Sequence, residues 1–395
     1  MKAMPIRAAA LALGSVVLAA TAPNPATSAD DPVKIGMIVT LSGPPGALGK
    51  QVEDGFRLAL EQQDGKLGGA AVELIVEDDE LKPDVALTKA EKLTSSDEVD
   101  IVVGTIFSNM LQAVFKPVIE SDTILISPNA GPSTFAGRNC HPNFFVTSYQ
   151  NNQNAEAMGA HAEAEGFEKV FLLAPNYQAG RDQLEGFKTN YTGEIADEVY
   201  TPLGHKDFSA ELARIATSGA DAIYTFMPGG MGVRLVKQFR AAGLADKMTF
   251  LSAFTVDETT LPAQKDDALG FFSVGNWAPD MELPRSARFV SDFLEKYGYV
   301  PGGYAMQAYD TARLIDSALT KTDGSTADKD ALRVAIAEAD FQSLRGDFAF
   351  NNNQYPIQDF FLTQVAKRAD DLYQTEIVAK VVDDGADSFA AECKM

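Results

Sequence analysis

Short apolar runs rich in β-branched residues recur along the chain, and charged, amphipathic segments separate them. One helix is expected from about residue 50 to 63, and another ends at Glu120. A helix is also expected to begin at Pro83, because proline suits the first turn of a helix. Nearly continuous apolar strands that alternate with helices are typical of parallel sheets covered on both faces, so the pattern predicts an α/β fold. The predicted strands are 33–39, 72–76, 101–106 and 123–126, followed by 170–173, 223–226 and 249–251.

A polar break at 150–154, with the sequence QNNQN, separates the two series of strands. The restart of the pattern after this break predicts two doubly wound, Rossmann-like lobes. We assign residues 30–149 and 278–355 to lobe 1, and residues 150–277 and 356–395 to lobe 2.

Ligands of doubly wound sheets bind beyond the carboxyl ends of the strands, so the loops after the strands are the first candidates for a site. These loops carry small, glycine-rich and aromatic residues, and the first of them contains Ser42. Free backbone N–H groups at the starts of the following helices suit an anion, although plain strand-to-helix turns would have similar sequences. The loops are 41–49, 107–108, 127–132, 175–180, 227–230 and 253–255.

The N-terminus has the pattern of a secretory signal peptide. Lys2 and Arg7 precede an uncharged apolar stretch, residues 8–20, that is too short to cross a bilayer as a helix. Thr27-Ser28-Ala29 then offers small residues for cleavage. We therefore expect residues 1–29 to be removed and the mature chain to reside in the periplasm. A buried N-terminal helix is the alternative interpretation.

Composition and charge exclude several classes of function. The chain has 395 residues with 55 acidic and 33 basic side chains, and the net charge of -22 disfavours nucleic-acid binding. Two cysteines and three histidines lack the spacing of a metal cluster, so no metal and no cofactor is expected. The sequence has no GxSxG or HExxH motif, and the glycine-rich stretch 43–51 lacks P-loop spacing, so no catalytic residue is predicted.

Taken together, several segments resemble periplasmic substrate-binding proteins of ABC importers, and more narrowly the leucine/isoleucine/valine-binding, or type I, family. The resemblance extends from about residue 33 to at least 355. It implies two lobes joined by three crossovers, a ligand enclosed between them, an ABC permease as partner and a monomeric chain. The segments that carry it are IGMIVTLSGPPGALG, VEDDELKP, VVGTIFS, ILISPNAGP and VKQFRAAG.

The ligand contacts of this family can be carried over one position at a time. The serine that holds the ligand carboxylate corresponds to Ser108, and the small residues after the fourth strand correspond to Asn129, Ala130 and Gly131. Aromatic positions of the family correspond to Leu48 in the first loop, Ala179 in the second lobe, with Tyr177 two residues earlier, and Tyr304 on a late helix.

The acidic residue that pairs with the ammonium of an amino-acid ligand falls near Phe254. An unpaired buried ammonium costs several kcal/mol, so this departure favours an aromatic or hydrophobic carboxylic acid held among aromatic side chains. The aromatic residues that we assign to this box are Tyr149, Tyr177, Phe254, Trp277 and Tyr304, although they are also compatible with core packing. The alternative is a branched-chain amino acid binder in which Asp257 or Glu258 replaces the lost acidic residue.

Three functional classes follow: an ABC-importer binding protein, a periplasmic sensor that presents the same ligand to a receptor, and an extracytoplasmic enzyme on this scaffold. The enzyme lacks sequence support because no nucleophile or metal motif is present.

The exported compartment is oxidising and the chain has two cysteines, so we also predict a Cys140–Cys393 disulfide. Unpaired thiols or a bond between two molecules are the alternatives.

Overall fold

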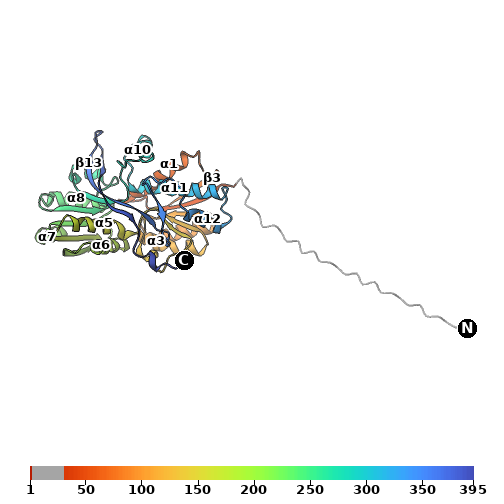
Figure 1. The fold of residues 1–395 in the computed structure, drawn as a ribbon, viewed down its shortest axis with the longest axis horizontal. Coiled ribbons are helices and arrows are strands. Elements are labelled where there is room, and N and C mark those ends of the chain that lie inside the picture. The colour runs from red at the N-terminus through yellow and green to blue at the C-terminus, as the bar shows by residue number, and fades with distance from the viewer. Residues whose placement is uncertain (2–30) are drawn as a thin grey trace.

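The computed structural model describes Met1 and residues 31–395. The predicted signal peptide, residues 1–29, therefore lies outside the described residues apart from Met1. Two lobes lie side by side along the long axis of the molecule, and each is built around one sheet (Figure 1). Within residues 31–395, helices that are both long and apolar enough to cross a membrane are absent.

The first lobe has a six-stranded sheet in the order β2-β3-β1-β4-β5-β6. Its strands are parallel except for β2, which pairs with β3 in the antiparallel direction. The strands are β1 (Val33–Val39), β2 (Lys66–Leu67), β3 (Ala70–Asp78), β4 (Ile101–Gly104), β5 (Ile124–Ser127) and β6 (Phe144–Val146). The helices are α1 (Gly46–Glu61), α2 (Pro83–Ser95), α3 (Ser108–Glu120), α4 (Ser133–Ala136), α10 (Pro284–Tyr297), α11 (Gly303–Lys321) and α12 (Lys329–Ala337), with α1 packed against α11 and α2 against α3.

The second lobe has an eight-stranded sheet in which β8, β7, β9, β10 and β11 run parallel. An antiparallel edge follows, where β13 pairs with β11, β12 and β14. The strands are β7 (Lys169–Pro175), β8 (Glu194–Thr201), β9 (Ala222–Phe226), β10 (Thr249–Ala253), β11 (Phe272–Gly275), β12 (Ala349–Phe350), β13 (Pro356–Lys367) and β14 (Tyr373–Gly385). The α-helices are α5 (Asn151–Ala164), α6 (Gln178–Thr189), α7 (Ser209–Thr217), α8 (Gly230–Ala241) and α9 (Leu261–Gln264), and two 3₁₀ turns are Lys265–Ala268 and Ala390–Glu392.

The chain passes between the two sheets three times: between β6 and α5, between β11 and α10, and between α12 and β12. The two-lobed α/β fold expected from the sequence is therefore confirmed, and the exact lobe boundaries stay a prediction. The strands β4 and β5 are buried along their whole length, as their uninterrupted apolar sequences require.

Helix α1 begins four residues earlier than the hydrophobic pattern indicated. The backbone at Gly46 and Gly49 lies directly against the end of β1: a β-carbon would lie 2.2 Å from the carbonyl oxygen of Leu41 at Gly46 and 2.0 Å from that of Thr40 at Gly49. Only glycine allows this approach, so the glycine-rich loop is the tight start of a helix.

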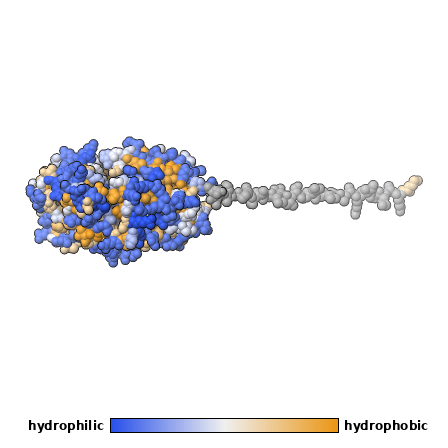
Figure 2. Space-filling view, turned by 90° about the horizontal axis from the view of Figure 1, so that it is seen from above, coloured by the Kyte–Doolittle hydropathy of each residue, from blue (hydrophilic) through white to orange (hydrophobic). Residues whose placement is uncertain are grey.

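The predicted disulfide is confirmed. Cys140 and Cys393 are bonded, with their Cα atoms 5.7 Å apart, and the bond holds the C-terminal segment on the first lobe. Arg138 and Glu392 form an ion pair beside it. The surface seen in Figure 2 is mostly hydrophilic with scattered hydrophobic patches, in keeping with the acidic composition.

Candidate ligand-binding site between the lobes

A cavity lies between the two lobes and contains about 310 Å³ of space that protein atoms do not occupy. Much of this space consists of gaps narrower than a water molecule, because the lining side chains lie close together. The lobes touch at its mouth: β-carbons built on Gly229 and Gly230 would lie 3.0 Å from the side chains of Leu48 and Pro44, respectively. The structure is therefore a closed form, and a ligand must enter when the lobes separate.

The cavity brings together most of the residues selected from the sequence. It also contains side chains that the sequence analysis missed, because they lie within strands, within helices or directly beside the expected positions. The predicted residues that line it are Leu48, Ser108, Asn129, Ala130, Tyr149, Tyr177, Ala179 and Tyr304. The additional residues are Ile106, Phe107, Asn151, Gln183, Phe226 and Pro228.

Five helices direct their N-termini toward this space. Leu48, Ser108, Asn151, Ala179 and Tyr304 belong to the first turns of α1, α3, α5, α6 and α11, respectively. The N-terminus of a helix carries partial positive charge and unpaired N–H groups, and the residues that line the cavity include no charged side chain. The cavity therefore favours an anionic group and offers no carboxylate to a cationic one.

Ser108 is the best-placed group for an anion. Its hydroxyl is buried and accepts a hydrogen bond from Asn151 Nδ2 at 3.1 Å, while Asn151 also donates to Asp182 at 2.9 Å. Residues 31–395 provide no acceptor for the Ser108 hydroxyl hydrogen or for the backbone N–H groups of Ser108 and Asn109, the first two residues of α3. These three donors remain available to a carboxylate.

The neighbouring turn, residues 129–131, differs from what the sequence resemblance led us to expect. The N–H of Ala130 donates to the carbonyl of Thr105 at 3.2 Å, and the N–H of Gly131 donates to Asn151 Oδ1 at 3.2 Å. Asn129 donates to Ile106 O at 2.6 Å and accepts from the Tyr149 hydroxyl at 2.9 Å. The turn therefore orients Tyr149 and Asn151, and its own N–H groups at 130 and 131 are already paired.

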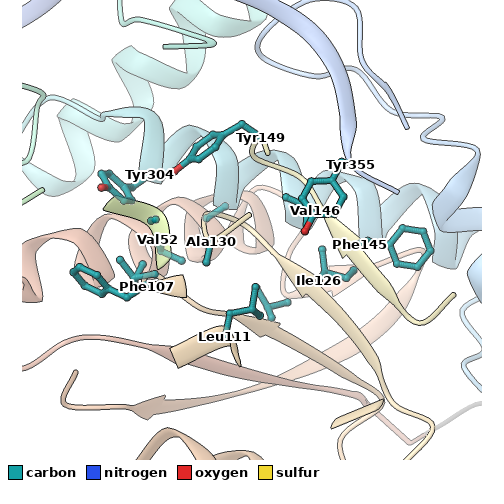
Figure 3. Packing of buried hydrophobic residues seen from close by; sticks show 14 of the residues in the cluster. Val52, Phe107, Leu111, Ile126, Ala130, Phe145, Val146, Tyr149, Tyr304 and Tyr355 are labelled. Carbon is teal, nitrogen blue, oxygen red and sulfur yellow. The ribbon is translucent and has the colours of Figure 1, made fainter. Parts of the chain in front are cut away.

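Aromatic side chains form the walls. Tyr177 of the second lobe lies 6.1 Å from Phe107 of the first lobe and 6.2 Å from Phe226, measured between ring centroids. Figure 3 shows Tyr149 and Tyr304 on one side of the space and Phe107 on the other. Burial raises the pKa of the Tyr149, Tyr177 and Tyr304 hydroxyls well above the usual value, so they stay neutral donors.

Phe254 lies behind this wall. Its ring is 5.2 Å from Tyr149, 5.9 Å from Tyr304 and 6.0 Å from Phe226. It thus completes the aromatic cluster, but Tyr149, Tyr304 and Phe226 separate it from the cavity itself.

Three predicted residues lie elsewhere. Ser42 is exposed and donates to the carboxylate of Asp78, so it closes a surface loop. Gly131 is buried against the backbone of Tyr149. Trp277 packs on Phe289 of α10 and donates from Nε1 to Ser286 at 2.7 Å, next to the crossover, where it lines a neighbouring cavity and not this one. Within residues 31–395, no group of three or more His, Cys, Asp or Glu side chains is placed to hold a metal ion.

Sequence comparisons identify the family of this chain. The family model described as periplasmic binding protein matches residues 32–370. A Leu/Ile/Val-binding protein homolog 6 from Brucella melitensis biotype 1 is 26% identical over 356 residues, which cover 87% of this chain and 90% of the relative.

Two solved structures extend the similarity. The solute-binding protein of an ABC transporter from R. palustris, in complex with benzoate, has a TM-score of 0.87 and 28% identity and covers 92% of this chain and 100% of its own. A second ABC-transporter solute-binding protein, from Rhodopseudomonas palustris BisB5 in complex with 3,4-dihydroxybenzoic acid, has a TM-score of 0.83 and 28% identity. The match covers 89% of this chain and 98% of that protein. The chain belongs to the periplasmic binding protein family, with the fold of the solute-binding components of ABC transporters.

Proposed function

We propose that this protein captures a small aromatic carboxylate between its lobes and delivers it to an ABC permease in the inner membrane. The observation that carries the proposal is the composition of the cavity. Aromatic rings from both lobes line it, helix N-termini and Ser108 supply donors for an anion, and its lining offers no charged partner for an ammonium. The complexes of similar proteins with benzoate and 3,4-dihydroxybenzoic acid support the same ligand class.

Each end of such a ligand has a matching surface. The carboxylate accepts from the Ser108 hydroxyl and from the N–H groups that begin α3. The ring lies among Phe107, Tyr177 and Tyr304, where offset or edge-to-face contacts stabilise it beyond simple burial. Because the closed cavity is narrow, the side chains that line it have to move apart by the thickness of the ring.

A branched-chain amino acid is the second candidate ligand, because the curated relatives carry the Leu/Ile/Val-binding name. It requires an ammonium partner that the cavity lining lacks. A sensor that presents the same acid to a receptor is the alternative to import. In either role, the mature chain acts in the periplasm, as a monomer, after loss of residues 1–29.

Titration calorimetry on the purified mature chain tests the ligand class. We expect benzoate and 4-hydroxycinnamate to bind with micromolar or tighter affinity, and leucine, isoleucine and valine to bind far more weakly. Micromolar leucine binding without a response to the acids would contradict the proposal. Uptake of labelled benzoate by cells with and without this gene then separates import from sensing, since a sensor is not required for uptake.

A further inference from the structure

A second cavity lies behind the aromatic wall and contains about 440 Å³ of space free of protein atoms. We call it the distal cavity. It is formed by the loop after β10, by β11 with the crossover that follows, and by the first turns of α11. Tyr304 lines this cavity and the ligand cavity alike, and Phe254 lies between them.

Two acceptor atoms of the distal cavity have no hydrogen-bond partner within residues 31–395. Asp257 Oδ1 accepts from the N–H and the hydroxyl of Thr259 at 2.8 and 2.5 Å, whereas its Oδ2 is buried and unpaired. Gln307 is 1% exposed, and its Oε1 is likewise unpaired. Buried acceptors are nearly always satisfied in folded proteins, so two of them lining one cavity indicate that a donor belongs there.

The second acidic residue of this cavity, Glu258, is already paired. Glu258 Oε1 accepts from the N–H and the hydroxyl of Thr375, both at 2.8 Å. The residues that line the distal cavity include no lysine or arginine. Asp257 and Gln307 therefore remain as the acceptors for a group that enters from the ligand cavity.

Phe254, which lines the distal cavity and packs on Tyr304, has a left-handed backbone with φ of 53°. That conformation is rare for a bulky side chain and costs free energy, and such strain is most often retained at ligand-binding positions.

We propose that Asp257 and Gln307 form a subsite that recognises a neutral hydrogen-bond donor, such as a phenolic hydroxyl, at the end of the bound ring opposite its carboxylate. The inference rests on the proposed function, because it assumes an aromatic acid anchored at Ser108. A ring anchored there and packed against Tyr304 directs its far end toward the distal cavity. An O–H group donated to a carboxylate forms a short, strong hydrogen bond.

The test compares matched ligands and matched variants by calorimetry. The ligands are benzoate, 4-hydroxybenzoate, 4-aminobenzoate and 4-methylbenzoate, because a methyl group has nearly the size of a hydroxyl but donates nothing. The variants are Asp257→Asn and Asp280→Asn. Asp257→Asn keeps an oxygen that accepts from Thr259 and replaces the unpaired oxygen by an NH₂ donor. Asp280→Asn removes the same charge from an exposed residue outside both cavities.

We expect the wild type and Asp280→Asn to bind the hydroxyl and amino ligands about tenfold or more tightly than the methyl ligand. Asp257→Asn should lose this preference and bind benzoate within about threefold of the wild type. If Asp257→Asn does not fold, Gln307→Met provides a second test of the subsite. It should also reduce the preference for the hydroxyl and amino ligands over the methyl ligand.

Equal affinities of the wild type for the hydroxyl and methyl ligands would overturn the subsite while leaving the proposed function intact, provided that benzoate binds. Retention of the preference in Asp257→Asn and Gln307→Met would overturn it as well. If none of the acids binds, the proposed function and the subsite fail together. Leucine binding that is abolished in Asp257→Asn would instead assign Asp257 as an ammonium partner and overturn the inference.

Discussion

Replacement of Arg345 by methionine should be among the most destabilising changes in this protein. Its guanidinium is fully buried where the chain passes between the lobes. It donates to the carbonyls of Thr147 and Ser148 at 2.7 and 3.2 Å and to Gln358 Oε1 at 2.7 Å, and it pairs with Asp310 at 3.3 Å. One side chain thus connects the first crossover, α11 and β13.

The magnitude follows from what remains after the substitution. Asp310 is fully buried and keeps only its hydrogen bonds from Ser343 Oγ at 2.6 Å and Leu344 N at 3.0 Å. Removing one partner of a buried ion pair typically costs about 3–5 kcal/mol, because the other charge stays uncompensated. Burial already raises the pKa of Asp310 even with Arg345 present, and loss of the arginine should raise it further.

This pKa shift makes the deficit, which is the unfolding free energy that Arg345→Met loses relative to wild type, depend on pH. The Arg345→Met variant should gain a proton on Asp310 at a higher pH than the wild type does. The free energy of unfolding of the variant, relative to wild type, therefore falls as pH rises between the two folded-state pKa values. The deficit should be largest near pH 8 and smaller near pH 5.5.

Urea denaturation at both pH values measures the effect. Arg288→Met is the control, because Arg288 forms an exposed pair with Asp292 and its loss should cost less than about 1 kcal/mol. The double variant Arg345→Met/Asp310→Asn should recover part of the stability, since no uncompensated charge remains. A deficit below about 1 kcal/mol for Arg345→Met, or one that does not change with pH, would refute the reasoning.

Four further outcomes are expected. Ser108→Ala should weaken benzoate binding by about ten- to a hundredfold in calorimetry through the loss of one hydrogen bond to a charged group, and an unchanged dissociation constant in a folded variant would remove Ser108 from the site. Burial raises the pKa of Glu258 to about 7, so the wild type should lose about 2 kcal/mol of unfolding free energy between pH 5.5 and 8 relative to Glu258→Gln, and parallel pH profiles would contradict this shift. Cys140→Ser/Cys393→Ser should lower the unfolding free energy by up to about 5 kcal/mol in the chain-entropy model, and mass spectrometry of alkylated wild type should detect no free thiol. Small-angle scattering should give a smaller radius of gyration with saturating benzoate than without it, because the ligand must prefer the closed form, and identical curves would argue against closure.

The sequence alone determined the architecture and the general position of the site. Hydrophobic periodicity identifies strands and helices because burial on both faces of a parallel sheet requires continuous apolar strands. The carboxyl ends of such strands meet at one edge of the sheet. Ser108, Asn129 and Tyr177 follow such strands, so the sequence predicts that they line one site, and the structure places all three around one cavity. A chain with two cysteines likewise allows one intramolecular disulfide, which the structure contains.

Only the tertiary structure decided which donors and which rings are available to a ligand. Sequence cannot show that the N–H groups of Ala130 and Gly131 are already paired, or that Trp277 packs on Phe289 beside the distal cavity and does not line the ligand cavity. Nor can it show that Asp257 and Gln307 line one cavity, since they are 50 positions apart on separate elements. Hydrogen-bond saturation and side-chain burial depend on neighbours that are distant in sequence, and these neighbours are fixed only when both lobes pack together.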